Sequence, residues 1–234
     1  MPSVLRPAPN RPLPPLLELQ SGDRLTQAEF HRRYAAYPDE AHFELIEGMV
    51  VMASPARIRH GEYQAALVFA LTYFKGATPG LAVADNATVI LSQRSEVQPD
   101  VCVRFLADAG GQTQVSSDEY ILGGPEWVGE VAHSSASIDL HQKKLAYQRG
   151  GVHEYLVLSV EEQELHWFHF KSRRKIIADS TGIFRSRALP GLWIDGPALL
   201  ECDTKRLIKT LDAGLASPEH AEFVRGLKSA RRRG

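Results

Sequence analysis

The sequence predicts an α/β (α+β) protein in which helices and strands are mixed along one chain. Residues 125–158 have the pattern of a strand, a turn, a helix and a second strand, which form a compact βαβ-like unit. Residues 81–91 and 95–105 are rich in Val and Ile, as is typical of strands. Residues 57–76 instead carry apolar side chains at helical spacing. Together these segments predict a sheet with helices packed on it.

Length, composition and charge narrow the functional class. The 234 residues fit one domain with terminal extensions, and a hydrophobic fraction of 44% is enough for a real core. With 27 basic and 28 acidic residues the net charge is −1, without the basic excess usual in a nucleic-acid binder. Contact with phosphates must therefore come from a local patch or a bound metal.

The sequence gives no sign of a membrane or secreted protein. No apolar run approaches the roughly 18 residues of a membrane helix. Cys102 and Cys202 lie far apart, with no CxxC spacing, so a cytoplasmic location is expected.

The chain divides into three parts. Residues 1–20 are rich in proline and predict a flexible arm. Residues 21–202 form the predicted folded domain. Residues 203–234 have a helical apolar pattern and end in a basic tail, so we expect a C-terminal helical extension.

The first elements have clear local signals. Thr26 and Glu29 form a capping box that predicts the start of a short helix, which ends before Pro38. Alternating residues on both sides of Glu47–Gly48 predict a β-hairpin. In the helix over 57–76, Gly76 is placed to be the residue just past the end.

The later segments are assigned by the same rules. Residues 108–124 are rich in Gly and Ser and predict a loop, either a functional lid or a disordered segment. Residues 164–170, 173–180 and 182–195 predict strands that continue the sheet as a meander.

A carboxylate stands inside the apolar strand at residues 127–133. Side chains alternate across a sheet, so Glu130 shares one face with Val128 and Ala132. An unpaired buried carboxylate is costly, and a cation or a metal usually resolves that cost. The alternatives are an edge strand with Glu130 in water, or a simple salt bridge.

A second acid, Asp100, follows Pro99 at the start of another predicted strand. Pro99 cannot donate a ladder hydrogen bond, so it marks a strand start, an edge or a bulge. The Pro-Asp pair is common in loops, and it gains weight from the buried-strand Glu130 that follows.

The helix after Glu130 carries three aligned polar residues. With Ser137 as the expected N-cap, Asp139, Lys143 and Tyr147 stand at i, i+4 and i+8 on one stripe. The functional interpretation directs Lys143 at the two carboxylates. The alternative is a surface Asp–Lys pair worth a few tenths of a kcal/mol.

These residues resemble the Uma family of restriction-endonuclease-like proteins, in the PD-(D/E)xK nuclease superfamily. The resemblance rests on residues of the central stretch and on flanking motifs, which are Glu130, Asp139, Lys143, Tyr147, Gly151–Val152, Glu154–Tyr155, the hairpin at 43–55, His60, Pro99–Asp100 and the segment 189–195. It covers about residues 25 to 200. The family implies a restriction-endonuclease-like core, a mixed β-sheet flanked by helices with the site at one sheet edge.

The resemblance also implies roles for individual residues. Asp100, Glu130 and the backbone carbonyl of Val131 would hold Mg²⁺ or Mn²⁺, and Lys143 would act on the attacking water or on developing charge. One position departs from the pattern: Ala132 stands where the superfamily has a lysine, so Lys143 must cover for it from the helix.

Further polar residues have a weaker claim as accessory residues of the site. Glu62 and His60 lie near the start of the long helix, where a carboxylate often completes such a site, although the helix dipole alone explains acids in a first turn. Glu47, beside Gly48, has turn chemistry as its simpler explanation. Glu44 shares this weaker claim. Asp139 and Tyr147 accompany Lys143 on its stripe.

Two functions follow from the sequence, and metal-dependent hydrolysis of a smaller phosphate substrate is a third possibility. The first is a metal-dependent endonuclease that hydrolyses phosphodiester bonds, in DNA rather than RNA, and a homodimer would suit the cutting of two strands. The second is an inactive nuclease-fold module that binds nucleic acid or protein. Ala132 and the neutral charge favour the second, and the set of Asp100, Glu130 and Lys143 favours the first.

Overall fold

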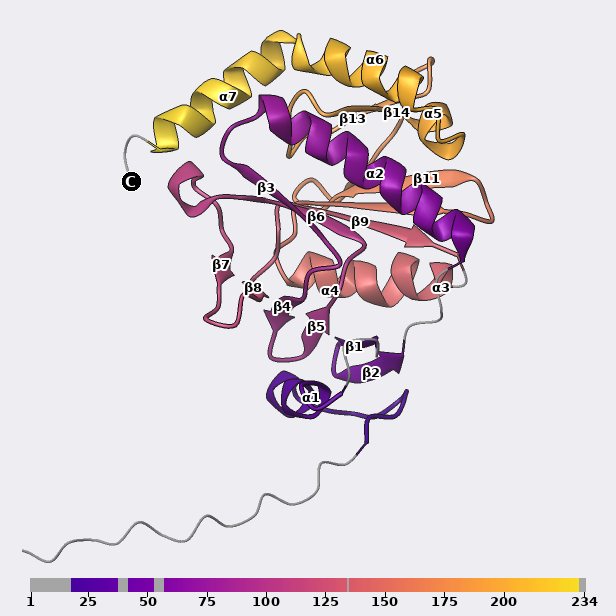
Figure 1. The fold of residues 1–234 in the computed structure, drawn as a ribbon, viewed down its shortest axis with the longest axis vertical. Coiled ribbons are helices and arrows are strands. Elements are labelled where there is room, and N and C mark those ends of the chain that lie inside the picture. Colours follow the sequence, from indigo (N-terminus) through magenta and orange to yellow (C-terminus); the bar gives the residue numbers. More distant parts are fainter. Residues whose placement is uncertain (1–17, 38–41, 53–56, 134, 232–234) are drawn as a thin grey trace, which may run out of the picture.

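A computed structural model of the chain describes residues 18–37, 42–52, 57–133 and 135–231. Its centre is a six-stranded mixed sheet in the order β12-β11-β10-β9-β6-β3. Helices cover both faces of this sheet, with α2 above it and α3–α4 below it in the view of Figure 1. The expected mixed sheet flanked by helices is confirmed.

The strands form three sheets. The central sheet contains β3 (Leu81–Asp85), β6 (Val101–Phe105), β9 (Trp127–Ala132), β10 (Glu154–Ser159), β11 (Glu164–His169) and β12 (Arg174–Ile176), of which β9 and β10 run parallel. The second sheet, in the order β2-β1-β5-β4-β8-β7, contains β1 (Phe43–Ile46), β2 (Met49–Met52), β4 (Val89–Ser92), β5 (Ser95–Val97), β7 (Gln114–Val115) and β8 (Ile121–Leu122). β13 (Ile183–Arg185) and β14 (Trp193–Asp195) form a separate pair.

The helices lie around these sheets. They are α1 (Gln27–Tyr34), α2 (Ile58–Ala77), the 3₁₀ turn η1 (Ala107–Ala109), α3 (Ala136–Ile138), the π-helical turn η2 (Asp139–Lys143), α4 (Lys144–Arg149), α5 (Gly196–Leu200), α6 (Thr204–Leu215) and α7 (Pro218–Arg231). None of the helices in the described ranges is long and apolar enough to cross a membrane.

Alternation along β9 divides the core between the two faces of the central sheet. Trp127 and Val131 point toward α2 and belong to the larger apolar cluster. Val128 and Ala132 point toward α4 and pack in a second cluster with Tyr147. The predicted alternation across this strand is therefore confirmed, and it places Glu130 on the α4 face.

The early local signals are confirmed. Thr26 caps α1 by accepting a hydrogen bond from the backbone of Glu29 at 3.4 Å. The β1–β2 hairpin turns at Glu47 and Gly48, whose φ angles of 51° and 84° are both left-handed, as tight two-residue hairpin turns require.

Other boundaries differ from the expectation. The predicted strands 81–91 and 95–105 each break in two, and their halves join different sheets. The breaks fall at Asn86, which has a left-handed φ of 50°, and at Pro99, which has no N–H for a ladder. The segment 108–124 is not a plain loop, since it contains the short strands β7 and β8.

The predicted helix ends and the predicted C-terminal meander also differ from the structure. Gly76 lies inside α2, which continues to Ala77 and is capped by Thr78. Ser135, and not Ser137, precedes α3. In the C-terminal region, β11 and β12 extend the central sheet, whereas β13 and β14 pair only with each other in the described part of the chain.

The terminal parts pack closely where they are described. In the predicted arm 1–20, residues 1–17 lie outside the described residues, and Leu19 is buried against α1 and the hairpin. In the predicted extension, Leu207, Leu211 and Leu227 join the larger apolar cluster together with α2. Of the basic tail, Arg231 pairs with Asp108 at 2.8 Å, and residues 232–234 lie outside the described ranges.

Candidate active site

Lys143 stands at the centre of a buried group of acids. Its Nζ lies 2.7 Å from Glu130 Oε1, 3.0 Å from Glu44 Oε1 and 3.8 Å from Asp139 Oδ1. The side chains of Lys143, Glu130 and Asp139 are exposed by only 4–6%. The lysine therefore reaches the strand glutamate from the helix, over the buried Ala132.

The helical segment after β9 aims these side chains at the sheet. Residues 139–143 form a π-helical turn, a feature that is frequent at functional sites. One turn further on, the Tyr147 hydroxyl donates to Glu130 Oε1 at 2.6 Å. The Tyr155 hydroxyl donates to the backbone carbonyl of Asp139 at 3.1 Å and anchors the turn to β10. The structure thus brings together the predicted stripe of Asp139, Lys143 and Tyr147.

Asp100 joins the site from the start of β6. Its Oδ2 accepts the Val131 N–H at 2.6 Å, and its Oδ1 lies 3.2 Å from His60 Nε2. The Gln64 amide donates to the backbone oxygen of Asp100 at 3.2 Å and to Asp85 Oδ1 at 2.6 Å. Asp100 is therefore fixed between β9 and the first turns of α2.

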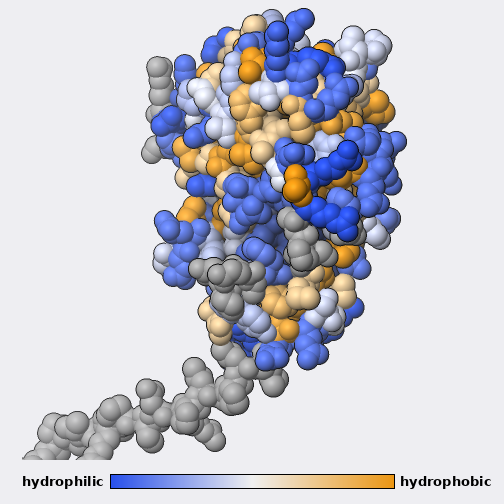
Figure 2. All heavy atoms as spheres, turned by 45° about the vertical axis from the view of Figure 1, so that its right-hand side comes forward, coloured by the Kyte–Doolittle hydropathy of each residue, from blue (hydrophilic) through white to orange (hydrophobic). Residues whose placement is uncertain are grey.

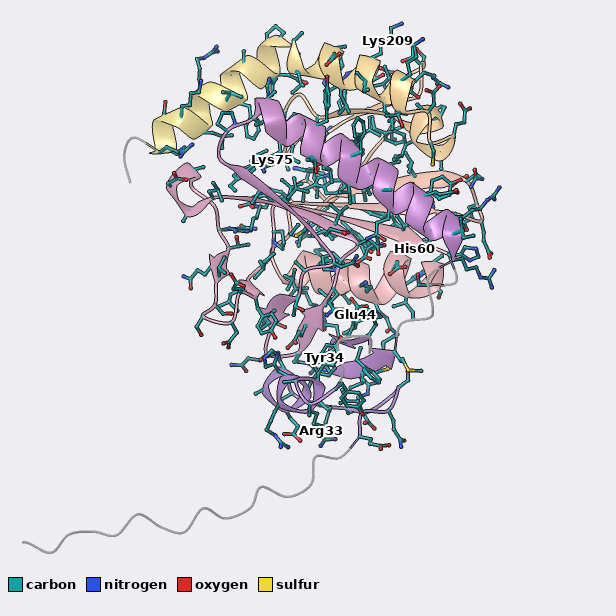
Figure 3. All side chains as sticks on the ribbon, viewed as in Figure 1. Arg33, Tyr34, Glu44, His60, Lys75 and Lys209 are labelled. Carbon is teal, nitrogen blue, oxygen red and sulfur yellow. The ribbon has the colours of Figure 1, made fainter. Side chains whose placement is uncertain are left out.

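Figure 3 shows where two of these groups lie. Figure 3 labels His60, close to the start of α2, and Glu44, which comes from β1 on the other side of the helical segment 135–149. Figure 2 turns this side of the molecule forward, and blue hydrophilic atoms surround a hollow at mid-height of this face.

Burial and the neighbouring charged groups shift the pKa values of Glu130 and Lys143. Burial raises the pKa of Glu130 well above its usual range, Lys143 opposes this shift, and Asp100, Asp139 and Glu44 add to it. For Lys143, burial alone would lower the pKa, but Glu130, Glu44 and Asp139 outweigh it and hold the pKa well above the usual range.

The pKa values of Asp139 and His60 are also raised, like those of Glu130 and Lys143. Burial raises the pKa of Asp139, and Lys143 opposes that shift. The hydrogen bond to Asp100 raises the pKa of His60.

The donor set fits a divalent cation. Three carboxylates, those of Glu44, Glu130 and Asp139, lie around the Lys143 ammonium, and the charge of Asp100 acts on the same Glu130, so acidic side chains outnumber the ammonium group. Oxygen donors of this kind are what Mg²⁺ binds. Among the described residues, three His, Cys, Asp or Glu ligand atoms come within 4.8 Å of one another at Glu162, Glu164 and His166, at the turn before β11 and in its first residues, and not at the acids around Lys143, where Lys143 holds Glu130.

Two of the predicted accessory residues lie elsewhere. Glu47 pairs with Arg149, and its carbonyl accepts from Arg94 at 2.7 Å, so it serves the hairpin turn. Glu62 lines a separate groove with Leu200 and Cys202. A first-turn position on α2 was the wrong guide, because His60 and Glu62 point to different sides of the helix.

Of two further contributing residues, Glu44 was expected only as a weaker accessory candidate, and Gln64 was not predicted. Glu44 binds Lys143 and also accepts the Gln98 N–H at 2.8 Å, which places it in the site. A glutamate in an otherwise apolar strand, the signal that singled out Glu130, applies to Glu44 as well. Gln64 carries no such signal, and only the fold brings it to Asp100.

Comparisons with known proteins agree with this architecture. The model of the Uma2 family, described as "Putative restriction endonuclease", matches residues 27–197. Among solved structures, a protein described as a "putative nuclease belonging to DUF820" from Anabaena variabilis ATCC 29413 aligns with a TM-score of 0.56 and 14% identity. The alignment covers 80% of this chain and 99% of that one, and at this identity it shows the fold alone. No curated protein matches the chain. Because the family model spans well over half of the sequence, the chain belongs to the Uma2 family, whose description is "Putative restriction endonuclease".

Proposed function

We propose that this protein is a metal-dependent endonuclease that hydrolyses phosphodiester bonds in DNA, with Mg²⁺ or Mn²⁺ as its cofactor. The observation that carries the proposal is the 2.7 Å contact between Lys143 Nζ and Glu130 Oε1. This contact places the Lys143 ammonium beside the carboxylate of Glu130. Ala132 occupies the usual lysine position and has no ammonium group. Membership of a nuclease family supports the same reaction class.

Each residue of the site has a role in this proposal. Asp100, Glu130 and the Val131 carbonyl would hold the cation. A bound divalent cation lowers the pKa of a coordinated water and stabilises charge on a phosphoryl oxygen. Lys143 remains protonated at neutral pH, because three carboxylates surround it, and it stabilises negative charge that develops on the phosphate. Glu44 and Tyr147 position Lys143 and Glu130.

A non-catalytic module is the competing function. Ala132 at the usual lysine position and the net charge of −1 favour it. A module of this kind would keep the fold and lose the reaction, so a cleavage assay separates the two functions.

The test uses the full chain with plasmid DNA, single-stranded DNA and RNA, each with Mg²⁺ or Mn²⁺. We expect cleavage of DNA that stops with EDTA, and loss of both cleavage and calorimetric metal binding in Asp100→Ala and Glu130→Gln. Glu201→Gln is the control, since Glu201 is exposed and pairs with Arg206, outside the group of side chains around Lys143 and Asp100. A folded wild type that neither binds these ions nor cuts any substrate contradicts the proposal.

A further inference from the structure

Helix α2 contacts Asp100 through two residues that lie one turn apart. His60 approaches the carboxylate, and Gln64 donates to the backbone oxygen of the same residue. Residues at i and i+4 share one face of a helix, so this face of α2 is directed at Asp100. Tyr63 and Leu67 lie within about 60° of His60 around the helix and pack in the core, so the same side of α2 faces the sheet and Asp100.

The imidazole and the carboxylate are spaced like two ligands of one ion. His60 Nε2 and Asp100 Oδ1 lie 3.2 Å apart. With bonds of about 2.1 Å, neighbouring ligands of an octahedral ion are about 3 Å apart, so both atoms can bind one ion with little movement. Asp100 Oδ2 is already engaged by the Val131 N–H, which leaves Oδ1 as the oxygen on the His60 side.

His60 also touches a second member of the proposed ligand set. Its ring hydrogen-bonds the backbone of Val131, whose carbonyl is the third proposed donor. The His60 side chain is 18% exposed, so an ion can reach it from solvent. His220 differs in this respect, because its ring is buried between Thr78 and the Leu215 carbonyl.

We propose that His60 is a nitrogen ligand of the divalent cation at Asp100, and that the site consequently prefers Mn²⁺ or another first-row transition ion to Mg²⁺. Imidazole nitrogen suits first-row transition ions, whereas Mg²⁺ takes oxygen donors. The inference rests on the proposed metal-dependent function and adds the chemical class of its ion. The alternative is a positioning residue that holds Asp100 without touching the ion.

The experiment measures metal affinity and metal coordination independently of activity. All variants carry His166→Ala, since Glu162, Glu164 and His166 form a surface group that can also take an ion. Calorimetry compares Mn²⁺ with Mg²⁺ for the parent, His60→Ala and Asp100→Ala. Pulsed electron paramagnetic resonance detects nitrogen bound to Mn²⁺. His31→Ala is the matched control, because His31 pairs with Glu96 at 2.9 Å far from Asp100.

We expect the parent to bind Mn²⁺ at least about 10-fold more tightly than Mg²⁺. His60→Ala should lose about 10- to 100-fold in Mn²⁺ affinity, change less than about 3-fold for Mg²⁺, and lose the nitrogen signal. His31→Ala should keep both affinities and the signal. Binding that depends on Asp100 but is unchanged in His60→Ala, or a parent without a nitrogen signal, overturns this inference and leaves the proposed nuclease intact. A parent that binds neither ion overturns both.

Discussion

Two buried glutamates on neighbouring parallel strands show two different ways to bury a carboxylate. Glu130 on β9 is 4% exposed and Glu154 on β10 is fully buried, and the two strands pair directly in the central sheet. Glu154 accepts from Trp167 Nε1, Ser186 Oγ and the backbone of Arg187 and Ala188, at 2.7–3.1 Å. Glu130 instead meets the ammonium of Lys143 within a group of acids.

The difference distinguishes a carboxylate that is satisfied by fixed donors from one that the proposed function uses. Four fixed dipoles satisfy Glu154 and tie the segment 186–189 to the sheet. Around Glu130, the extra acids Asp100, Asp139 and Glu44 raise its pKa further, which a purely structural arrangement would avoid. Excess like charge beside a buried carboxylate is therefore a better sign of function than burial itself.

Removing the lysine should have the largest effect. In Lys143→Met, Glu130 loses its cation, so we expect the free energy of unfolding to fall by about 3–5 kcal/mol. Cleavage should fall by about 10²- to 10³-fold, as for loss of one charge-stabilising group. Urea unfolding and plasmid cleavage check these values. The double variant Glu130→Gln/Lys143→Met should regain much of the stability and none of the activity, and a double variant that still cuts would contradict the role of Lys143.

Removing the structural glutamate should affect stability alone. Glu154→Ala leaves buried donors of Trp167, Arg187 and Ala188 without an acceptor, at a cost of about 1–3 kcal/mol for each one that stays unsatisfied. We expect a total loss of about 3 kcal/mol or more by urea unfolding. Metal affinity per folded molecule should remain unchanged, and a loss of metal binding in the folded variant would show that the two glutamates are coupled.

The tyrosine contact should matter less. Tyr147→Phe removes one hydrogen bond to Glu130, and bonds to charged groups contribute about 1.5–3 kcal/mol. We expect a loss near the lower end of that range, because Lys143 continues to hold Glu130. Tyr73→Phe, which removes a hydrogen bond to Asp212 on the surface, provides the comparison in the same unfolding experiment. A Tyr147→Phe variant as stable as the wild type would mean that the hydroxyl does not help to hold Glu130.

The smallest expected effect is a pH dependence of the folding stability that arises from Glu154. Burial raises its pKa above the usual value near 4.5, against the four donors. The folded state then holds this proton more tightly than the unfolded state, so its contribution to stability is full below pH 4.5 and is lost as the pH rises through the folded pKa. Between these limits, stability should fall with pH more steeply in the wild type than in Glu154→Gln, as measured by unfolding at a series of pH values. Equal slopes would mean that the donors cancel the effect of burial.

Local patterns predicted much of the fold. The Glu47–Gly48 turn and the Thr26 cap depend on neighbouring residues, so the sequence contained what was needed. The break at Asn86 was not predicted, because apolar alternation on both sides of it resembles one continuous strand. Which half joins which sheet is decided by packing between distant segments.

The sequence predicted those residues of the candidate site that are unusual among their neighbours in the chain. Glu130 in an apolar strand and the stripe through Lys143 were visible, and the structure brings them together. Glu44 and Gln64 contribute through contacts across 99 and 36 residues of chain, respectively, to Lys143 and to Asp100, and spacing along the sequence does not encode such contacts. The sequence did not show that Glu62 lies in a separate groove, because its position along the helix does not by itself show where its side chain points. That direction follows only when the face of the helix that packs on the core is known.

The π-helical turn at 139–143 makes the number of residues in this helix as important as their identity. Each residue of an α-helix rotates the next by about 100°, so eight residues of α-helix would place Asp139 and Tyr147 about 80° apart. A π turn absorbs one extra residue, which leaves the equivalent of seven and reduces that angle to about 20°. Deleting one residue within the turn would leave seven α-helical residues and nearly the same angle, whereas inserting one residue would rotate everything before it by about 100°. The alignment of Asp139 with Tyr147 therefore depends on the number of residues in this helical segment.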